Sequence, residues 1–409
     1  MSSRNLLPLL PLALASVLPR PVANYNGHKV LRVSTAGNAT AVMESLSALN
    51  YNQWSDRVGG HLDISLSAED FEKFQALSLT LSIMHEDLGA SSPLRARRRQ
   101  IGALPSEAWF KSYHDYEHHV QYWDDLHAAF PDNSERFVVG HSYEGREIFG
   151  LKLFGTNDTG VPKKAVIWHG TVHARKWIST MSVEYLTYSI INGHKNNIAT
   201  YRDLLDKFDF YILPVVNPDG FVYSQTHDRL WRKNRVPHRL ADGKTCYGTD
   251  PNRNWPYQWN ITIGNQRKAG SSDPCAESYK GQAPGDTPET QALVSHMQNV
   301  SQTQNLSLYI DFHAYGNQYL IPYGYTYEKA GKVWTVNDMT GFWVGPVISN
   351  YPVTGGSQDY AYDAAGAQYA YVMEISDDLG ESEFEWPEFA ILSTSQEVLA
   401  GVLVLLQGV

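Results

Sequence analysis

Two histidines stand where their side chains could bind a metal ion. His173 follows an apolar stretch that ends at Trp168, and His313 ends a second apolar stretch, residues 306–312. If both stretches are strands of one α/β sheet, these side chains lie at the edge where such sheets build their sites. Two imidazoles hold zinc when a third ligand joins them, whereas most single histidines are structural. The pair therefore predicts a zinc site only together with further residues.

Seven short motifs accompany the two histidines along the chain. They are SYEGREI at 142–148, HARKWIS at 173–179, NPDGF at 217–221, RLWRK at 229–233, DPNRNW at 250–255, HAY at 313–315 and PYGY at 322–325. Together they resemble the zinc metallocarboxypeptidases of the A/B (funnelin-type) subfamily, in that family's order and at its spacing. The resemblance covers almost the whole chain after the first residues. One motif alone would be weak, but seven in order are specific.

The resemblance implies a site for one zinc ion. The family's ligands are the His and Glu of an H-x-x-E motif and a distal His, which fall on His173, Lys176 and His313. Asp250 matches the residue that orients the first histidine. Cys246 and Cys275 fall at a pair that the family joins by a disulfide, which would close a loop of about 30 residues and contribute roughly 3–4 kcal/mol.

The resemblance also implies catalytic and substrate-binding roles. Glu374 matches the general base that activates the metal-bound water, and Arg232 matches the group that polarises the scissile carbonyl. A guanidinium pairs bidentately with a carboxylate, which suits Arg253 for the substrate's C-terminus. The expected substrate-binding residues are Asn252, Arg253, Tyr351, Gln358, Arg229 and Tyr315.

Lys176 departs from the family at a metal-ligand position. An ammonium has no lone pair, and at about 4 Å from a divalent ion it repels that ion by roughly 8 kcal/mol at an effective dielectric constant near 20. Lysine could ligate only as a neutral amine, and lowering its pKa below 7 costs roughly 4–5 kcal/mol. The sequence therefore predicts an altered zinc site.

Three alternatives remain for the third position. The Lys176 ammonium could take the place of the metal and pair with Glu374. His169 could offer a substitute nitrogen, although it lies at the strand end rather than on the ligand loop. Asp311 lies two residues before His313, so that both side chains share one face of a strand. It could be a ligand, although a supporting role behind His313 fits this position better.

Gln358 is expected to form the floor of the side-chain pocket. It lies in the segment GGSQD at 355–359. Family members that release basic residues carry an acid at the floor, and those that release acidic residues carry a base. A neutral amide therefore predicts neutral, apolar or aromatic C-terminal residues.

The site needs a large α/β domain to position it, expected over residues 101–409. Apolar strands are predicted at 137–139, 148–153, 165–168, 208–215, 306–312 and 370–375, and helices at 116–130, 178–191, 288–300 and 393–406. Strands interleaved with helices favour a single large mixed, mostly parallel sheet with helices on both faces.

Residues 24–90 predict a small α+β pro-domain before it. Strands are expected at 28–34, 61–66 and 79–84, with helices at 39–49 and 67–77. The second helix opens with a capping-box sequence at Ser67. Residues 91–100 form a linker with Arg95, Arg97, Arg98 and Arg99, where an activating trypsin-like or dibasic-cutting protease could release the pro-domain.

The N-terminus and composition favour a secreted protein. Residues 1–23 resemble a signal peptide, with a cut between residues 15 and 23, and are too short to span a membrane. Candidate glycosylation sites are Asn38, Asn157, Asn260, Asn299 and Asn305. The 409 residues carry a net charge of −10, with 43% hydrophobic and 19% charged residues. This composition argues against nucleic acid or a membrane as a partner and favours a soluble, extracellular monomer.

Two functions follow from these residues. In the first, a secreted zymogen releases neutral or apolar residues from the C-termini of peptides and proteins, with its activity impaired by Lys176. In the second, the protein is a zinc-deficient pseudoenzyme that binds peptide C-termini without cleaving them.

Overall fold

The computed structural model describes residues 27–53, 60–85, 104–156, 162–263, 269–327, 342–376 and 384–409. The predicted signal peptide, the arginines at 95–99 and Asn157 lie outside these ranges.

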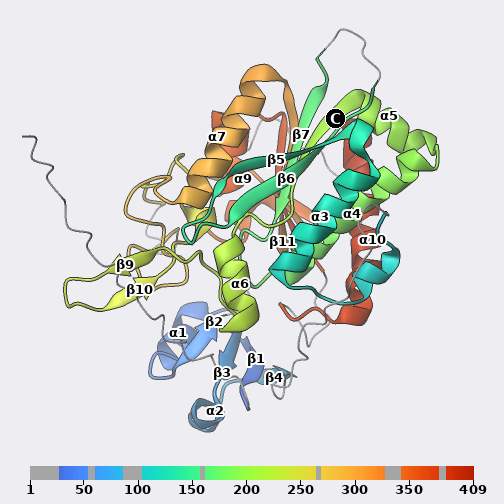
Figure 1. The fold of residues 1–409 in the computed structure, drawn as a ribbon. Coiled ribbons are helices and arrows are strands. Elements are labelled where there is room, and N and C mark those ends of the chain that lie inside the picture. Colours follow the sequence, from blue (N-terminus) through green and yellow to red (C-terminus); the bar gives the residue numbers. More distant parts are fainter. Residues whose placement is uncertain are drawn as a thin grey trace, which may run out of the picture.

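A small α+β unit comes first along the chain (Figure 1). It comprises β1 (Lys29–Ser34), α1 (Ala39–Ser45), β2 (Tyr51–Gln53), β3 (His61–Leu66), α2 (Ala68–Gln75) and β4 (Leu81–His85). The sheet order is β2-β3-β1-β4, and its pairs are antiparallel. The Ser67 side chain accepts a hydrogen bond from the Asp70 N–H, which confirms the predicted cap of α2. The short strand β2 was not predicted.

The second unit is built on a mixed sheet that has eight strands among the described residues. These are β5 (Ser134–His141), β6 (Glu147–Leu153), β7 (Lys164–Gly170), β8 (Phe208–Leu213), β11 (Leu306–Ala314), β12 (Gln318–Ile321), β13 (Trp343–Pro346) and β14 (Tyr369–Ile375). Their order is β13-β12-β14-β11-β7-β8-β6-β5. The central strands β14, β11, β7 and β8 run parallel, whereas β5, β6 and β12 pair antiparallel. The predicted fold class is confirmed.

Helices cover both faces of this sheet because its central strands are apolar on both sides. On β7, Val166 and Trp168 join the core on one face, while Ala165 and Ile167 join the core on the other. The helices are α3 (Tyr116–Ala129), α4 (Trp177–Lys195), α5 (Ala199–Lys207), α6 (Pro218–Thr226), α7 (Pro288–Thr303), α9 (Ser357–Asp359) and α10 (Ile391–Gly408). In Figure 1, α7 lies on one side of the sheet, and α3, α4 and α10 lie on the other. Helices α5 and α6 were not predicted.

Helix α10 is apolar because it is a core helix. Within the described residues, one helical segment, Glu388–Gly408, has the length and composition of a membrane span, but half of that window is buried. Its residues Val398, Val402 and Leu405 belong to the same core cluster as α4.

The small unit contacts the large one beside the sheet edge that carries the histidines. Val30 and Met84 of the small unit form an apolar cluster with Leu230 and Phe384 of the large one. Beside that cluster, the Tyr315 hydroxyl donates a 2.8 Å hydrogen bond to the buried carboxylate of Asp63, which also pairs with Arg32. The small unit is therefore joined to the large one at the residue that closes the HAY motif.

Candidate active site

Three neighbouring elements bring the predicted metal and catalytic residues together. The loop between β7 and α4 carries His173 and Lys176, and β11 carries His313. In the parallel pair β11–β14, His313 lies directly opposite Glu374. The rings of His173 and His313 lie 4.8 Å apart, edge to face. Motifs up to about 200 residues apart in sequence thus meet at one buried point of the sheet edge.

The loop that presents His173 is held in an unusual backbone conformation. Thr171 has a φ of +57°, in the left-handed region that β-branched residues rarely adopt. Its N–H donates to the Ser179 hydroxyl at 3.0 Å, and its own hydroxyl bonds to Thr180. Such a conformation costs about 1–3 kcal/mol and persists only where its surroundings enforce it. The first turn of α4 therefore fixes the loop.

Asp250 joins the first histidine to the catalytic arginine. One carboxylate oxygen lies 3.0 Å from His173 Nε2, and the other accepts from Arg232 Nε at 3.0 Å and Nη2 at 2.9 Å. Burial would raise the pKa of Asp250, but the charges of Arg232 and His173 hold that pKa well below its ordinary value. Burial and Arg232 lower the pKa of His173 well below its ordinary value. The His173 ring is therefore neutral, and its Nε2–H donates to Asp250.

Asn252 and Arg253 follow Asp250 on one turn (Pro251–Arg253) and are buried beside it. Arg253 donates one hydrogen bond to the Asn252 carbonyl at 2.8 Å, and its Nε is buried without a hydrogen-bond partner. The predicted companion Tyr351 lies with its ring centre 5.8 Å from the Arg253 guanidinium. The guanidinium thus keeps donor capacity for an anionic ligand.

His313 is fixed from behind by groups that the motifs do not mark. Its Nε2 lies 3.0 Å from Asp311, whose carboxylate also accepts from the Ser357 hydroxyl at 2.7 Å. The supporting position weighed for Asp311 is therefore the observed one. His169 bonds to the Tyr309 hydroxyl at 2.7 Å and lies 3.4 Å from Asp311, behind the site. Ser357 was missed because a serine in a glycine-rich segment carries no distinctive signal.

Lys176 reaches into the space between the second histidine and the predicted base. Its side chain is 1% exposed, and Nζ lies 2.9 Å from His313 Nδ1 and 3.2 Å from Glu374 Oε2. The expected pairing of Lys176 with Glu374 is present. An ammonium that donates to both groups occupies the lone pair of the histidine and neutralises the carboxylate.

These residues match a family-type zinc site at two of its three ligand positions. His173 Nδ1 is buried without a hydrogen-bond partner, and because its Nε2 is bonded to Asp250, this nitrogen carries a lone pair. His313 Nδ1 faces the same region but accepts from Lys176. Among the described residues, no group of three His, Cys, Asp or Glu side chains could hold a metal ion. As Lys176 stands, the donor set falls one ligand short of the family's site.

The remaining substrate residues lie at separate places around this cluster. Gln358 on α9 is buried, and its Nε2 has no hydrogen-bond partner. Tyr315 faces the small unit through Asp63. Arg229 stacks on Trp177 at 3.7 Å and donates to the carbonyls of Arg175 and Phe384. The structure thus does not bring Arg229 and Tyr315 into contact with the histidines.

Asp63 is a second residue that the sequence analysis missed. It is the one charged side chain within the apolar strand 61–66, apart from the terminal histidine, and it is fully buried. A buried carboxylate in a small unit demands partners, so that this position could have been noticed.

The disulfide and most of the sequons lie within the described residues. Cys246 and Cys275 are bonded, as the resemblance implied, with Cα atoms 5.1 Å apart. Asn38, Asn260, Asn299 and Asn305 are all exposed.

Comparisons with known proteins agree with the resemblance stated from the motifs. Residues 119–342 match the family described as zinc carboxypeptidase. A metallocarboxypeptidase A-like protein of Trichophyton verrucosum is 35% identical over 96% of both chains. A crystal structure of thrombin-activatable fibrinolysis inhibitor superposes with a TM-score of 0.79 at 24% identity, covering 94% of this chain and 99% of the other. The bovine form of that protein, in complex with tick carboxypeptidase inhibitor, has a TM-score of 0.62 and 28% identity, covering 73% and 98% of the two chains.

Proposed function

This chain belongs to the zinc carboxypeptidase family, and from that premise we propose that it is a carboxypeptidase A-like exopeptidase whose activity Lys176 holds low. One observation carries the proposal. Asp250 joins His173 and Arg232 in a buried group that continues into Asn252 and Arg253. A protein without use for peptide C-termini has no evident need to bury two arginines and an unpartnered imidazole nitrogen together.

Each residue of this group has a task on a peptide substrate. Arg253 binds the terminal carboxylate with the donors that the protein leaves unused, and Asn252 and the Tyr351 ring complete that pocket. Arg232, held by Asp250, stabilises the oxyanion that develops on the scissile carbonyl. Glu374 serves as the general base once it is released from Lys176.

Zinc would be held by His173 and His313 and, when bound, would lower the pKa of a water molecule and polarise the scissile carbonyl. The lone pair on His173 is already available, but the one on His313 accepts from Lys176. Zinc therefore binds in competition with the ammonium, which makes both zinc occupancy and turnover low.

Gln358 sets the preference for the residue that is released. Its amide is uncharged and buried, so a charged substrate side chain at this floor would lose its hydration without gaining an opposite charge. Neutral, apolar or aromatic C-terminal residues are therefore favoured.

The small N-terminal unit acts as an activation domain in this proposal. Its contacts with Tyr315 and Phe384 lie beside the site, and a cut among the arginines at 95–99 would separate it from the large domain. The apolar N-terminus and the exposed sequons support an extracellular glycoprotein. Its partners are then peptide or protein C-termini and an activating protease.

A second function is favoured by the contact of Lys176 Nζ with Glu374 at 3.2 Å. If zinc never displaces the ammonium, Arg253 still binds peptide C-termini, and the protein is a zinc-deficient binding protein. Both functions share the recognition of the terminal carboxylate and differ at residue 176.

Peptide cleavage by the processed protein and by Lys176→Glu distinguishes the two functions. We expect slow release of C-terminal residues by the wild type, and a rate at least about a hundredfold higher in Lys176→Glu, because the substitution removes the competing ammonium and supplies the missing ligand. Lys176→Met is the matched control, since it removes the charge but adds no ligand. Binding of free C-termini without cleavage by the wild type would favour the second function. No gain in Lys176→Glu would overturn the role given to Lys176.

A further inference from the structure

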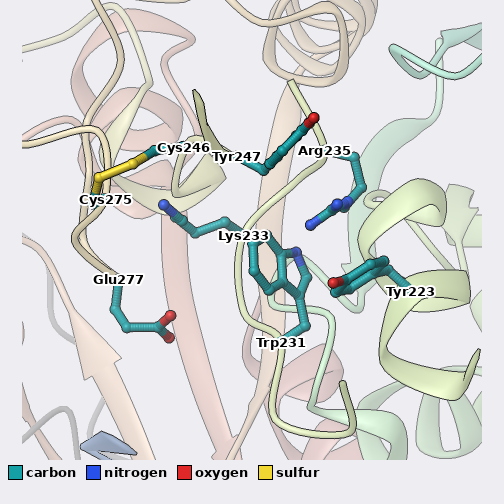
Figure 2. A pocket seen from close by; sticks show the side chains of 8 residues that line it. All are labelled: Tyr223, Trp231, Lys233, Arg235, Cys246, Tyr247, Cys275 and Glu277. Carbon is teal, nitrogen blue, oxygen red and sulfur yellow. A yellow bond between two sulfur atoms is a disulfide. The ribbon is translucent and has the colours of Figure 1, made fainter. Parts of the chain in front are cut away.

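A second pocket lies beside the Cys246–Cys275 disulfide, separate from the candidate active site (Figure 2). Its volume is about 250 Å³. This is slightly below the usual range of pockets for drug-sized ligands, which begins at about 300 Å³. The pocket therefore suits a small molecule of roughly the size of one amino acid rather than a peptide.

Alternation along residues 231–235 separates this pocket from the active site. Trp231, Lys233 and Arg235 line the pocket, whereas Arg232 between them turns to Asp250. Asn234 likewise turns away and donates to Glu289 at 2.8 Å. Successive side chains of an extended segment point to opposite sides. One segment thus presents Arg232 to the cleft and three other side chains to the second pocket.

Lys233 places a buried positive charge in the wall of the pocket. It is 2% exposed, and its ammonium donates one hydrogen bond, to the Pro274 carbonyl at 3.0 Å. An ammonium has three donors, so this group keeps hydrogen-bonding capacity for an anion. Burial lowers the pKa of Lys233 to about 8, as expected for a cation without a close counter-ion.

Glu277 supplies the opposite charge on the same side of the Trp231 ring, as seen in Figure 2. One of its oxygens lies 3.3 Å from Arg175 Nη1, and its side chain is 49% exposed. Lys233 and Glu277 do not form an ion pair with each other in the described part of the chain. The pocket therefore holds a cation and an anion that a ligand carrying both charges could bridge.

Aromatic rings form the remaining wall. Trp231, Tyr223 and Tyr247 line the pocket and are each only partly buried. The Arg235 guanidinium lies 3.6 Å from the centre of the Tyr223 ring and 4.4 Å from that of Trp231, and so holds these rings in place. Such rings suit an apolar or aromatic side chain.

We propose that this pocket binds a free amino acid with an apolar or aromatic side chain, its carboxylate on Lys233 and its ammonium near Glu277. Binding here requires neither zinc nor hydrolysis, so the proposal stands apart from the proposed function and can fail without it. A ligand in this pocket contacts the residues on both sides of Arg232. The pocket thus lies next to the residue through which it could influence the cleft.

Calorimetric titration with free phenylalanine tests the proposal. The full chain carrying Arg253→Met is used, so that the clamp of the active site does not compete for the ligand. We expect saturable binding of phenylalanine, and binding about ten- to hundredfold weaker after a further Lys233→Met substitution. Lys244→Met, at an exposed lysine of the nearby hairpin, is the matched control and should leave the affinity unchanged.

Blocked ligands and Glu277→Gln separate the two charges. N-acetylphenylalanine lacks the ammonium, so its affinity should not change in Glu277→Gln, whereas that of phenylalanine should fall about tenfold. Because Glu277 is half exposed, this variant keeps the test open if Lys233→Met does not fold. No saturable binding up to about 10 mM, or equal affinity in Lys233→Met, would contradict the proposal. Equally strong binding of a peptide blocked at both ends would assign the pocket to extended chains instead.

The affinity should also depend on pH. The charged groups that act on Lys233 are Glu277, Asp250 and Asp273, which favour its ammonium, and Arg235, which disfavours it. A ligand carboxylate needs the charged form, so binding of N-acetylphenylalanine should weaken as the pH rises through about 8. An affinity that stays constant from about pH 6 to 9.5 would contradict the role of Lys233.

Discussion

The two sides of the candidate active site treat their buried cations differently. Around Asp250, Arg232 is paired bidentately with a carboxylate, and Arg253 retains donors for a ligand. Around Lys176, the cation is bonded to His313 and Glu374, the two groups that the family's chemistry needs unoccupied. The recognition side is thus arranged for a substrate, whereas the metal side is closed on itself. The difference teaches that C-terminal recognition and hydrolysis depend on separable groups in this cleft.

Removing the Asp250 carboxylate should have the largest effect. Asp250→Ala leaves Arg232 buried without its bidentate partner and His173 without its acceptor, which should lower the free energy of unfolding by about 3–5 kcal/mol. Chemical denaturation of the processed domain measures it. Asp242→Ala, at an exposed aspartate of the hairpin between β9 and β10, is the control and should change stability by less than about 0.5 kcal/mol. A loss below about 1 kcal/mol at Asp250 would remove its central role on the recognition side.

Arg253 sharpens the comparison at the level of binding. Arg253→Met should weaken binding of a peptide with a free C-terminus about ten- to hundredfold, because it deletes a charge-assisted contact. A C-terminally amidated peptide should lose much less affinity. Fluorescence anisotropy with both peptides measures the difference, and Arg239→Met, at an exposed arginine, is the control. Equal losses for the two peptides would mean that Arg253 does not read the carboxylate.

Glu374→Gln probes the metal side and should cost less than Asp250→Ala. Lys176 keeps its bond to His313, and the new amide can still accept a hydrogen bond, so we expect a loss of about 1–3 kcal/mol in unfolding free energy. Thermal and chemical unfolding of the two variants side by side give the order. A larger cost at Glu374 than at Asp250 would reverse the comparison.

The smallest effect is expected where the small unit touches the site. Tyr315→Phe removes the hydrogen bond to Asp63 and should weaken docking of the small unit by about 0.5–1.5 kcal/mol. In the unprocessed chain, affinity for a C-terminal peptide should then rise about two- to tenfold. Tyr319→Phe is the control, because the Tyr319 hydroxyl is buried without a hydrogen-bond partner. A rise of equal size in both variants would show that the Asp63 contact does not restrict the cleft.

The sequence predicts those parts of the fold and the site that local patterns encode. The long strands and helices around His173 and His313 follow from apolar runs, and the cap of α2 follows from Ser67. The pairing of Lys176 with Glu374 could be anticipated because both positions lie in recognisable motifs. The strands β12 and β13 were missed because each has only four residues and no alternating pattern.

Contacts between distant residues without motifs could not be predicted. Asp63 and Tyr315 lie 252 residues apart, and neither indicates the other. Ser357 supports Asp311 only because α9 packs beside β11. The pocket at Lys233 likewise requires the disulfide and three separate segments to converge, which depends on tertiary packing.

Zinc content measured by elemental mass spectrometry tests the central claim most directly. The claim is that the Lys176 ammonium competes with zinc for the position between His313 and Glu374. For protein produced with ample zinc, the account predicts occupancy well below one zinc ion per chain in the wild type and in Lys176→Met, and close to one in Lys176→Glu. Full occupancy in the wild type would contradict it, because a buried ammonium and a zinc ion cannot share that position.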